Sequence, residues 1–196
     1  GSELPNISSA IQVSRQDIST VWNAWDETEL PVVGTLKNTV PGHQPAVIVL
    51  DGSWAMRSRW DEVLDLLEDA PHVRRVLLAD KDVQEFEFDT PESRTRAFQS
   101  LRQYEPSGGR DNVTALRTAW TVASRIADSQ IIWIHGPQPY ALSTIATLWR
   151  PFNRSDVPGL IDAPMMVGPN VVVDELPQLK NVHSVPLIGK DSNNFW

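Results

Sequence analysis

The sequence contains no cysteine among its 196 residues. This absence excludes disulfide bonds, thiolate metal sites and cysteine-based catalysis, but it does not fix the cellular compartment. The chain also has no apolar run approaching the ~20 residues that span a bilayer, and no signal peptide is visible. We therefore expect no membrane insertion by this segment.

Basic residues are few relative to acidic ones. The chain has 17 lysines and arginines against 25 aspartates and glutamates, which gives a formal net charge of -8. This balance argues against non-specific nucleic-acid binding, because phosphate backbones attract basic surfaces. No glycine-rich phosphate loop is present either, so we expect no nucleic-acid partner and no cofactor.

The remaining composition suits a globular domain. A hydrophobic content of 41% and a charged content of 21% are ordinary for one domain of this length. The eight tryptophans are a high count, and one or two of them are expected at a contact surface. The opening Gly1-Ser2 resembles a cleavage scar, so we expect a longer parent protein. A bacterial, extracytoplasmic or membrane-anchored parent is a hypothesis.

One stretch, 45–56, organises the rest of the chain. Its apolar run, 46–50, is short, rich in β-branched residues and apolar on both faces, which predicts a buried strand. Such strands belong to parallel sheets, whose ligands bind beyond the carboxyl ends of the strands. Asp51 and Ser53 follow the run directly and are therefore candidate binding residues.

Hydrophobic periodicity predicts the other elements. Strands are expected at 73–79, 83–88, 131–134, 165–167 and 182–188, and the alternating 83–88 strand should be antiparallel to its neighbour. Helices are expected between the Asp51 loop and Pro71, and at 90–104, 114–128, 142–149 and 174–179. This order predicts an α/β fold, a doubly wound, mostly parallel six-stranded sheet with helices on both faces and the 46–50 strand in its centre.

Residues 1–44 are predicted to form an N-terminal helical and loop extension that packs on the domain at 45–196. A helix-capping signal is followed by four apolar residues at helical spacing: Ile18, Val21, Trp22 and Trp25. These side chains are too apolar to leave in water, and the segment is too short for a core of its own.

Three predicted loops fall on the same edge of the sheet. Their sequences are DGSWA (51–55), GGRDNVTAL (108–116) and IHG (134–136). With the strand order, they resemble the von Willebrand factor A domain over residues 45 to 190. In that family the loops carry Asp-x-Ser-x-Ser, Gly-Gly-Thr and Thr-Asp-Gly. The resemblance implies a Rossmann-like fold and a protein-protein interaction domain of the adhesion type.

The family's loops form a metal-ion-dependent adhesion site for Mg²⁺. This chain keeps Asp51 and Ser53, but it has Ala55, Arg110 and His135 where the family has the second serine, the threonine and the late aspartate. Mg²⁺ requires an oxygen shell, and an arginine offers no acceptor atom. The comparison therefore implies a degenerate site without a resident metal, and a residual site at Asp51 and Ser53 is the alternative.

We hypothesise that the Arg110 guanidinium replaces the metal as the positive group facing Asp51. A protonated His135 would add to this positive field and attract an acidic residue of a protein partner. Trp54 is a candidate contact anchor if it stands exposed, and packing under the N-terminal segment is the alternative. The candidate partner-binding residues are Asp51, Ser53, Trp54, Arg110, Asp111 and His135.

Other roles remain open for these residues. Asp51 and Ser53 are also typical of helix caps, His135 of a hydrogen-bonded strand end, and Arg110 of a solvated side chain. The alternative function is a hydrolase that uses Ser53, His135 and an acid such as Asp111. No Gly-x-Ser-x-Gly elbow or oxyanion-hole signature supports it, so we expect no enzyme activity. A purely structural module of a larger protein is the third alternative.

Overall fold

The computed structural model describes residues 20–22, 29–31, 44–152, 158–175 and 182–185. Contacts between Cα atoms divide the chain into two compact units, Gly1–Val40 and Pro41–Trp196. All six candidate site residues belong to the second unit.

The first unit contains a pair of short strands where a helix was expected. β1 (Thr20–Trp22) and β2 (Glu29–Pro31) pair antiparallel, with Thr20 opposite Pro31 and Trp22 opposite Glu29. The predicted helix is therefore wrong at 20–22, where two β-branched residues and a tryptophan favour an extended backbone. The rest of that helix lies outside the described residues, and the docking of the extension stays a prediction.

The second unit is built on a six-stranded sheet with the strand order β5-β4-β3-β6-β7-β8. Its strands are β3 (Ala46–Asp51), β4 (Val73–Ala79), β5 (Val83–Glu87), β6 (Gln130–His135), β7 (Leu160–Pro164) and β8 (Val182–Ser184). All neighbours are parallel except β4 and β5, which are antiparallel. This arrangement confirms the predicted fold class, the antiparallel strand and the central place of β3.

β3 is buried along its whole length, which explains its lack of polar alternation. Its successive side chains reach opposite faces of the sheet. Ile48 and Leu50 belong to the core beneath α2 (Trp60–Glu68), whereas Val47 and Val49 belong to the core beneath α4 (Val113–Ala123). Both faces of the sheet therefore need a helical cover.

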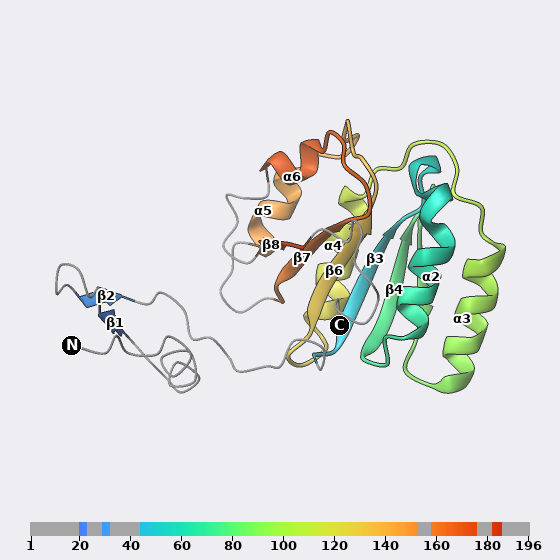
Figure 1. Ribbon diagram of the computed structural model, residues 1–196, viewed down its shortest axis with the longest axis horizontal. Helices are drawn as coiled ribbons and strands as arrows, with labels where there is room; N and C mark the ends of the chain where they lie inside the picture. Colours follow the sequence, from blue (N-terminus) through green and yellow to red (C-terminus); the bar gives the residue numbers. More distant parts are fainter. Residues whose placement is uncertain (1–19, 23–28, 32–43, 153–157, 176–181, 186–196) are drawn as a thin grey trace, which may run out of the picture. The chain divides into compact units, whose positions relative to one another are not determined.

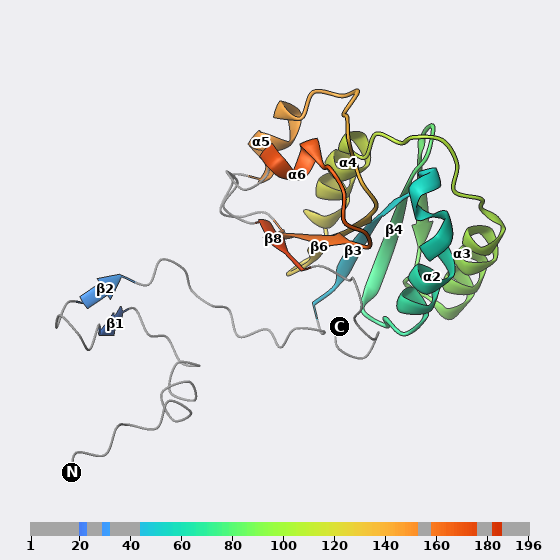
Figure 2. The ribbon, with the colours of Figure 1, turned by 45° about the horizontal axis from the view of Figure 1, so that its top comes forward.

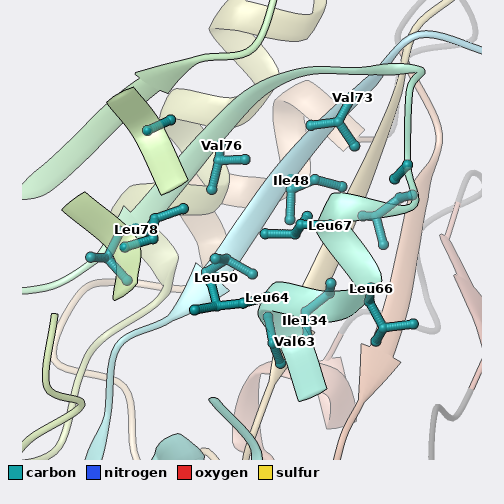
Figure 3. Close-up of a cluster of buried hydrophobic side chains, with 14 of the residues drawn as sticks. Ile48, Leu50, Val63, Leu64, Leu66, Leu67, Val73, Val76, Leu78 and Ile134 are labelled. Atoms are coloured by element: carbon teal, nitrogen blue, oxygen red, sulfur yellow. The ribbon is translucent and has the colours of Figure 1, made fainter. Parts of the chain in front are cut away.

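One face is covered by α2 and α3 (Pro91–Gln103), and a 3₁₀ helix, η1 (Trp54–Arg59), leads into α2. Leu64 and Leu67 of α2 lie over Ile48 and Leu50 of β3 (Figure 3). Burial of each such leucine stabilises the fold by about 1.5–3 kcal/mol. α3 begins at a capping box between the side chains and backbone N–H groups of Thr90 and Ser93, with Pro91 in its first turn.

The opposite face is covered by α4, α5 (Ala146–Phe152) and α6 (Val171–Glu175), as Figures 1 and 2 show. The largest side chains of this core are Trp133 and Phe152, both fully buried. Among the described residues, each helix is too short or too polar to cross a bilayer.

The elements after β6 differ most from the sequence prediction. The expected strand at 165–167 is wrong, because β7 is Leu160–Pro164 and Met165 and Met166 form a bend after it. The helices are shifted as well: the structure has Val113–Ala123 for 114–128, Ala146–Phe152 for 142–149 and Val171–Glu175 for 174–179. β7 contains a buried aspartate, Asp162, which interrupts the kind of apolar run by which the other strands were predicted.

Candidate functional site

The carboxyl ends of β3, β4, β6 and β7 meet at one edge of the sheet, and the loop between α3 and α4 crosses this edge (Figure 1). Two backbone hydrogen bonds fasten this loop to the start of η1. The N–H of Trp54 donates to the Gly108 carbonyl at 2.8 Å, and the N–H of Ser107 donates to the Gly52 carbonyl at 3.1 Å. The three loops predicted from the sequence to share an edge are therefore brought together.

Asp51 is completely buried at the centre of this edge, and both of its carboxylate oxygens face donors. Oδ1 accepts hydrogen bonds from the Ser53 N–H at 3.0 Å and from Asn112 Nδ2 at 3.2 Å. Oδ2 accepts hydrogen bonds from Ser53 Oγ at 2.8 Å, the Gly136 N–H at 3.2 Å and Gln138 Nε2 at 2.9 Å. An ionised carboxylate is an acceptor-only group, and these five neutral donors suit it.

The two amide side chains that contact Asp51 are themselves held in place. The indole N–H of Trp133, which can only donate, bonds to Asn112 Oδ1 at 3.2 Å and so directs the Asn112 NH₂ group to Asp51. Gln138 is buried, and its backbone N–H donates to the Pro169 carbonyl at 2.9 Å. The donors around Asp51 are therefore fixed by the loops and do not depend on mobile surface side chains.

Two glycines permit the close approach of these loops. A Cβ on Gly52 would lie 2.5 Å from Tyr104 Oη and 2.7 Å from the Ala79 carbonyl oxygen. Tyr104 Oη donates a hydrogen bond to the Gly52 carbonyl at 2.9 Å, and burial raises the pKa of this phenol. A Cβ on Gly136 would lie 3.1 Å from the Ala55 side chain. Ala55 thus packs against Gly136.

Arg110 does not face Asp51, so that hypothesis is wrong. Its guanidinium forms an ion pair with Asp80, with 2.7 Å between Nη2 and Oδ1, and also donates to Ser107 Oγ at 3.2 Å. Asp80 directly follows β4 and therefore reaches the same edge of the sheet. Both carboxylate oxygens of Asp51 already accept hydrogen bonds from neutral donors, so neither is left for a guanidinium.

Asp111 has a structural role at the start of α4. Oδ1 accepts a hydrogen bond from the Val113 N–H at 3.0 Å, which satisfies a free donor of the first helical turn. Oδ2 accepts a hydrogen bond from the Ser143 N–H at 2.6 Å. Asp111 thereby joins α4 to the loop after β6.

His135 is buried and bound on both ring nitrogens. Nε2 lies 2.6 Å from Asp162 Oδ1, and Nδ1 lies 2.6 Å from the Gly136 carbonyl oxygen. Asn170 Nδ2 also lies 3.4 Å from Nδ1, so groups from β6, β7 and the loop after β7 surround the ring. The ring also stacks on Trp133, with 3.8 Å between the ring centroids, and Ser184 Oγ donates to Asp162 Oδ2 at 2.7 Å.

The residues of the hydrolase alternative are not assembled into a triad. Ser53 Oγ donates to Asp51, His135 is bound to Asp162 and Gly136, and Asp111 caps α4. No hydrogen bond joins any two of Ser53, His135 and Asp111 in the part of the chain that the structure describes. Within the same residues, no three histidine, aspartate or glutamate side chains group as a metal site.

Exposed apolar side chains gather on the loops of this edge. Among the described residues the large exposed hydrophobic side chains are four, which we call the apolar rim: Trp54 (65% exposed), Tyr140 (49%), Leu142 (83%) and Val167 (88%). Trp54 follows β3, Tyr140 and Leu142 follow β6, and Val167 follows β7. Trp54 was the member of this group that the sequence singled out.

The sequence prediction missed four residues that hold the site together: Asp80, Asn112, Gln138 and Asp162. Asn112 and Gln138 lie within three residues of candidates that were chosen, but neutral amides carry no distinctive motif. Asp162 contacts His135 across 27 positions of sequence. Such a pairing becomes visible only when β6 and β7 are placed side by side.

No family model matches the sequence. No curated protein matches it either. Among solved structures, the chain is similar to the VWA domain of SpRpn10, with a TM-score of 0.53, 12% identity, and coverage of 78% of this chain and 93% of that chain. It is also similar to proximal thread matrix protein 1 from the mussel byssus (TM-score 0.54, 10% identity, 78% of this chain and 44% of that chain).

A third similar structure is a von Willebrand factor type A protein from Catenulispora acidiphila, with a TM-score of 0.55, 12% identity, and coverage of 79% of this chain and 40% of that chain. The chain thus spans less than half the length of the mussel and Catenulispora proteins. At these identities the likeness is one of fold. The fold is of the von Willebrand factor A type.

Proposed function

We propose that this domain is a non-catalytic protein-binding module that docks its partner on the apolar rim, without a bound metal. The observation that carries the proposal is the position of the rim. Exposed tryptophan, tyrosine, leucine and valine side chains surround the loop edge, and exposed apolar groups of this kind mark interaction sites.

The surroundings of Asp51 support a degenerate metal site. An Mg²⁺ ion needs several oxygen ligands, whereas the Asp51 oxygens face N–H and O–H donors from Ser53, Asn112, Gly136 and Gln138. Ala55 supplies no oxygen, and Arg110 supplies only donors. This donor set does not fit the ion, so we assign no role to a metal.

The surroundings of Arg110 and His135 change the expected chemistry of the partner. The acidic partner was expected because Arg110 and His135 were to provide a positive field. Both are paired with carboxylates, Arg110 with Asp80 and His135 with Asp162. An apolar partner surface therefore suits the loop edge better than an acidic residue does.

The metal part of the proposal is tested by calorimetric titration with MgCl₂ and MnCl₂. We expect no saturable heat at millimolar metal. Saturable binding that is lost in Asp51→Asn would overturn the metal-free site, while leaving the rim to be judged by the next experiment.

The partner is sought with the photo-reactive residue p-benzoylphenylalanine at position 142 of the full chain, expressed in the cells that normally produce it. The matched control is position 117, since Arg117 is exposed on α4 and outside the rim. Once the partner is purified, Trp54→Ala and Leu142→Ala should each weaken its binding at least ~10-fold, as anchors in interface centres do. Arg117→Ala should leave binding unchanged. Equal cross-linking at both positions, or neutral rim variants, would refute docking on the rim.

A further inference from the structure

β5 forms one lateral edge of the sheet, away from the loop edge. In the described part of the chain its only strand neighbour is β4. α3 packs against it on one face. Among the described residues, one long side of this strand therefore has no ladder partner.

The backbone groups on that open side can be identified from the pairing. The Phe88 N–H donates to the Arg74 carbonyl at 3.0 Å, so Phe88 directs its backbone groups toward β4. Because this direction alternates along an antiparallel strand, Phe86 also faces β4. The N–H and C=O groups of Glu85 and Glu87 then face the open side, where a further strand could bond to them.

A groove of about 200 Å³ accompanies this edge. β5 lines it with Glu85, Phe86 and Glu87, and α3 lines it with Ser93, Arg96, Ala97 and Ser100. Phe86 packs on the core beneath α2 and α3, so this face of the edge is partly apolar. The volume suits one small aliphatic side chain of an added strand.

The other face of the same edge is acidic. Glu85, Glu87 and Asp89 all pair with the single guanidinium of Arg75, at 3.3 Å for Glu85 Oε1 and 3.8 Å for Glu87 Oε1. Three carboxylates against one cation leave a surplus of two negative charges. A second copy of β5 would place like charges opposite each other, which is unfavourable. A basic strand would be complementary.

We propose that the open edge of β5 accepts an extended basic segment of another protein as a seventh strand. Strand addition of this kind uses backbone bonds for affinity and alternate side chains for selectivity. Lysine or arginine side chains on one face would lie over Glu85 and Glu87, and a valine-sized side chain on the other face would enter the groove. This site is separate from the apolar rim and does not depend on the function proposed for it.

The test is a titration of the ¹⁵N-labelled full chain with the blocked peptide acetyl-Thr-Lys-Val-Lys-Val-Lys-amide, followed by NMR. We expect saturable shifts of the amide signals of Glu85, Glu87 and Ala97, and none for Asp51. A peptide with glutamate in place of each lysine should not bind. Absence of saturation, equal binding of the acidic peptide, or shifts confined to the loop edge would each overturn the proposal.

Two variants separate the backbone from the charge contribution. Glu87→Pro removes an N–H that faces away from β4, a change that edge strands tolerate, and it should abolish the shifts at β5. Glu87→Lys retains the N–H at a side chain that is 66% exposed, and should weaken binding about fivefold, as the loss of cross-strand ion pairs predicts. The matched control is Asp65→Lys on α2, which should bind the peptide as the unchanged chain does. If Glu87→Lys binds equally well, the charge argument is wrong.

Discussion

Two buried aspartates in the same sheet are satisfied in opposite ways. Asp51 at the end of β3 is held by five neutral donors from three loops. Asp162 in β7 is held by one imidazole ring, that of His135, and one hydroxyl, that of Ser184. Gly136 links the two, because its N–H donates to Asp51 and its carbonyl oxygen lies 2.6 Å from His135 Nδ1.

The two aspartates differ in how many hydrogen bonds offset the free-energy cost of burying the carboxylate. Around Asp51 the compensation is divided among many bonds, so the loss of one donor should be tolerable while the loss of the carboxylate leaves several donors without an acceptor. Around Asp162 the compensation is concentrated in one pair, so removing either partner leaves a buried polar group without its main partner. Three predictions test this contrast, and a fourth concerns the Gly52 loop beside Asp51.

The largest effect is expected for removal of the Asp51 side chain. Asp51→Ala should lower the free energy of unfolding by about 4 kcal/mol, because several buried donors lose their acceptor at ~1–3 kcal/mol each before water enters. Chemical denaturation measures this, with the exposed Asp65→Ala as the control near zero. If Asp51→Asn were instead more stable than the unchanged chain, the Asp51 carboxylate would be a negative charge that the donors do not compensate. That result would support a metal site at Asp51.

The second effect concerns the His135–Asp162 pair. Asp162→Asn alone should cost about 3 kcal/mol, since it breaks a buried hydrogen-bonded pair with 2.6 Å between Nε2 and Oδ1. Combined with His135→Gln in a double-mutant cycle, the two should couple by ~2 kcal/mol, which denaturation of all four proteins measures. Additive losses would show that the pair is no stronger than separate contacts.

The sheet could be predicted from the sequence where burial leaves a continuous apolar run. β3 and β4 were located from such runs, and the alternation in β5 indicated its antiparallel pairing. β7 was missed because Asp162 interrupts it, and the residue that makes this aspartate tolerable, His135, lies on another strand. Local pattern carries no information about that partner.

The sequence predicted where the candidate site lies, but not which hydrogen bonds and ion pairs its residues form. The topology brings Asp51, Ser53 and His135 to one edge, as expected. The hypothesis that Arg110 bonds to Asp51 failed because Asp80, which directly follows the neighbouring strand β4, pairs with the guanidinium. Asn112 and Gln138 donate to the two Asp51 oxygens, and neutral amides cannot be recognised as such donors from sequence alone.

The third prediction tests how evenly the hydrogen bonds to Asp51 contribute to the free energy of unfolding. Gln138→Met removes the Nε2 donor at nearly constant volume, and should cost about 1.5–2 kcal/mol, the range for a hydrogen bond to a charged group. Denaturation should thus rank it below both aspartate variants. A loss as large as that of Asp51→Ala would mean that one amide dominates the site.

The smallest effect is expected for Tyr104→Phe, which removes only the hydrogen bond to the Gly52 carbonyl. The loss should be about 1 kcal/mol at neutral pH.

Burial raises the pKa of Tyr104 above its ordinary value of 10.0, so the unfolded chain releases this proton before the folded chain does. The contribution of Tyr104 is therefore complete below pH 10 and falls as the pH rises above it. Denaturation of both proteins between pH 8 and about pH 11 measures this difference, and the phenylalanine variant should lose less stability over that interval. Parallel curves would place the phenol in contact with water, and the Gly52 loop would then be less tightly closed than the 2.9 Å bond implies.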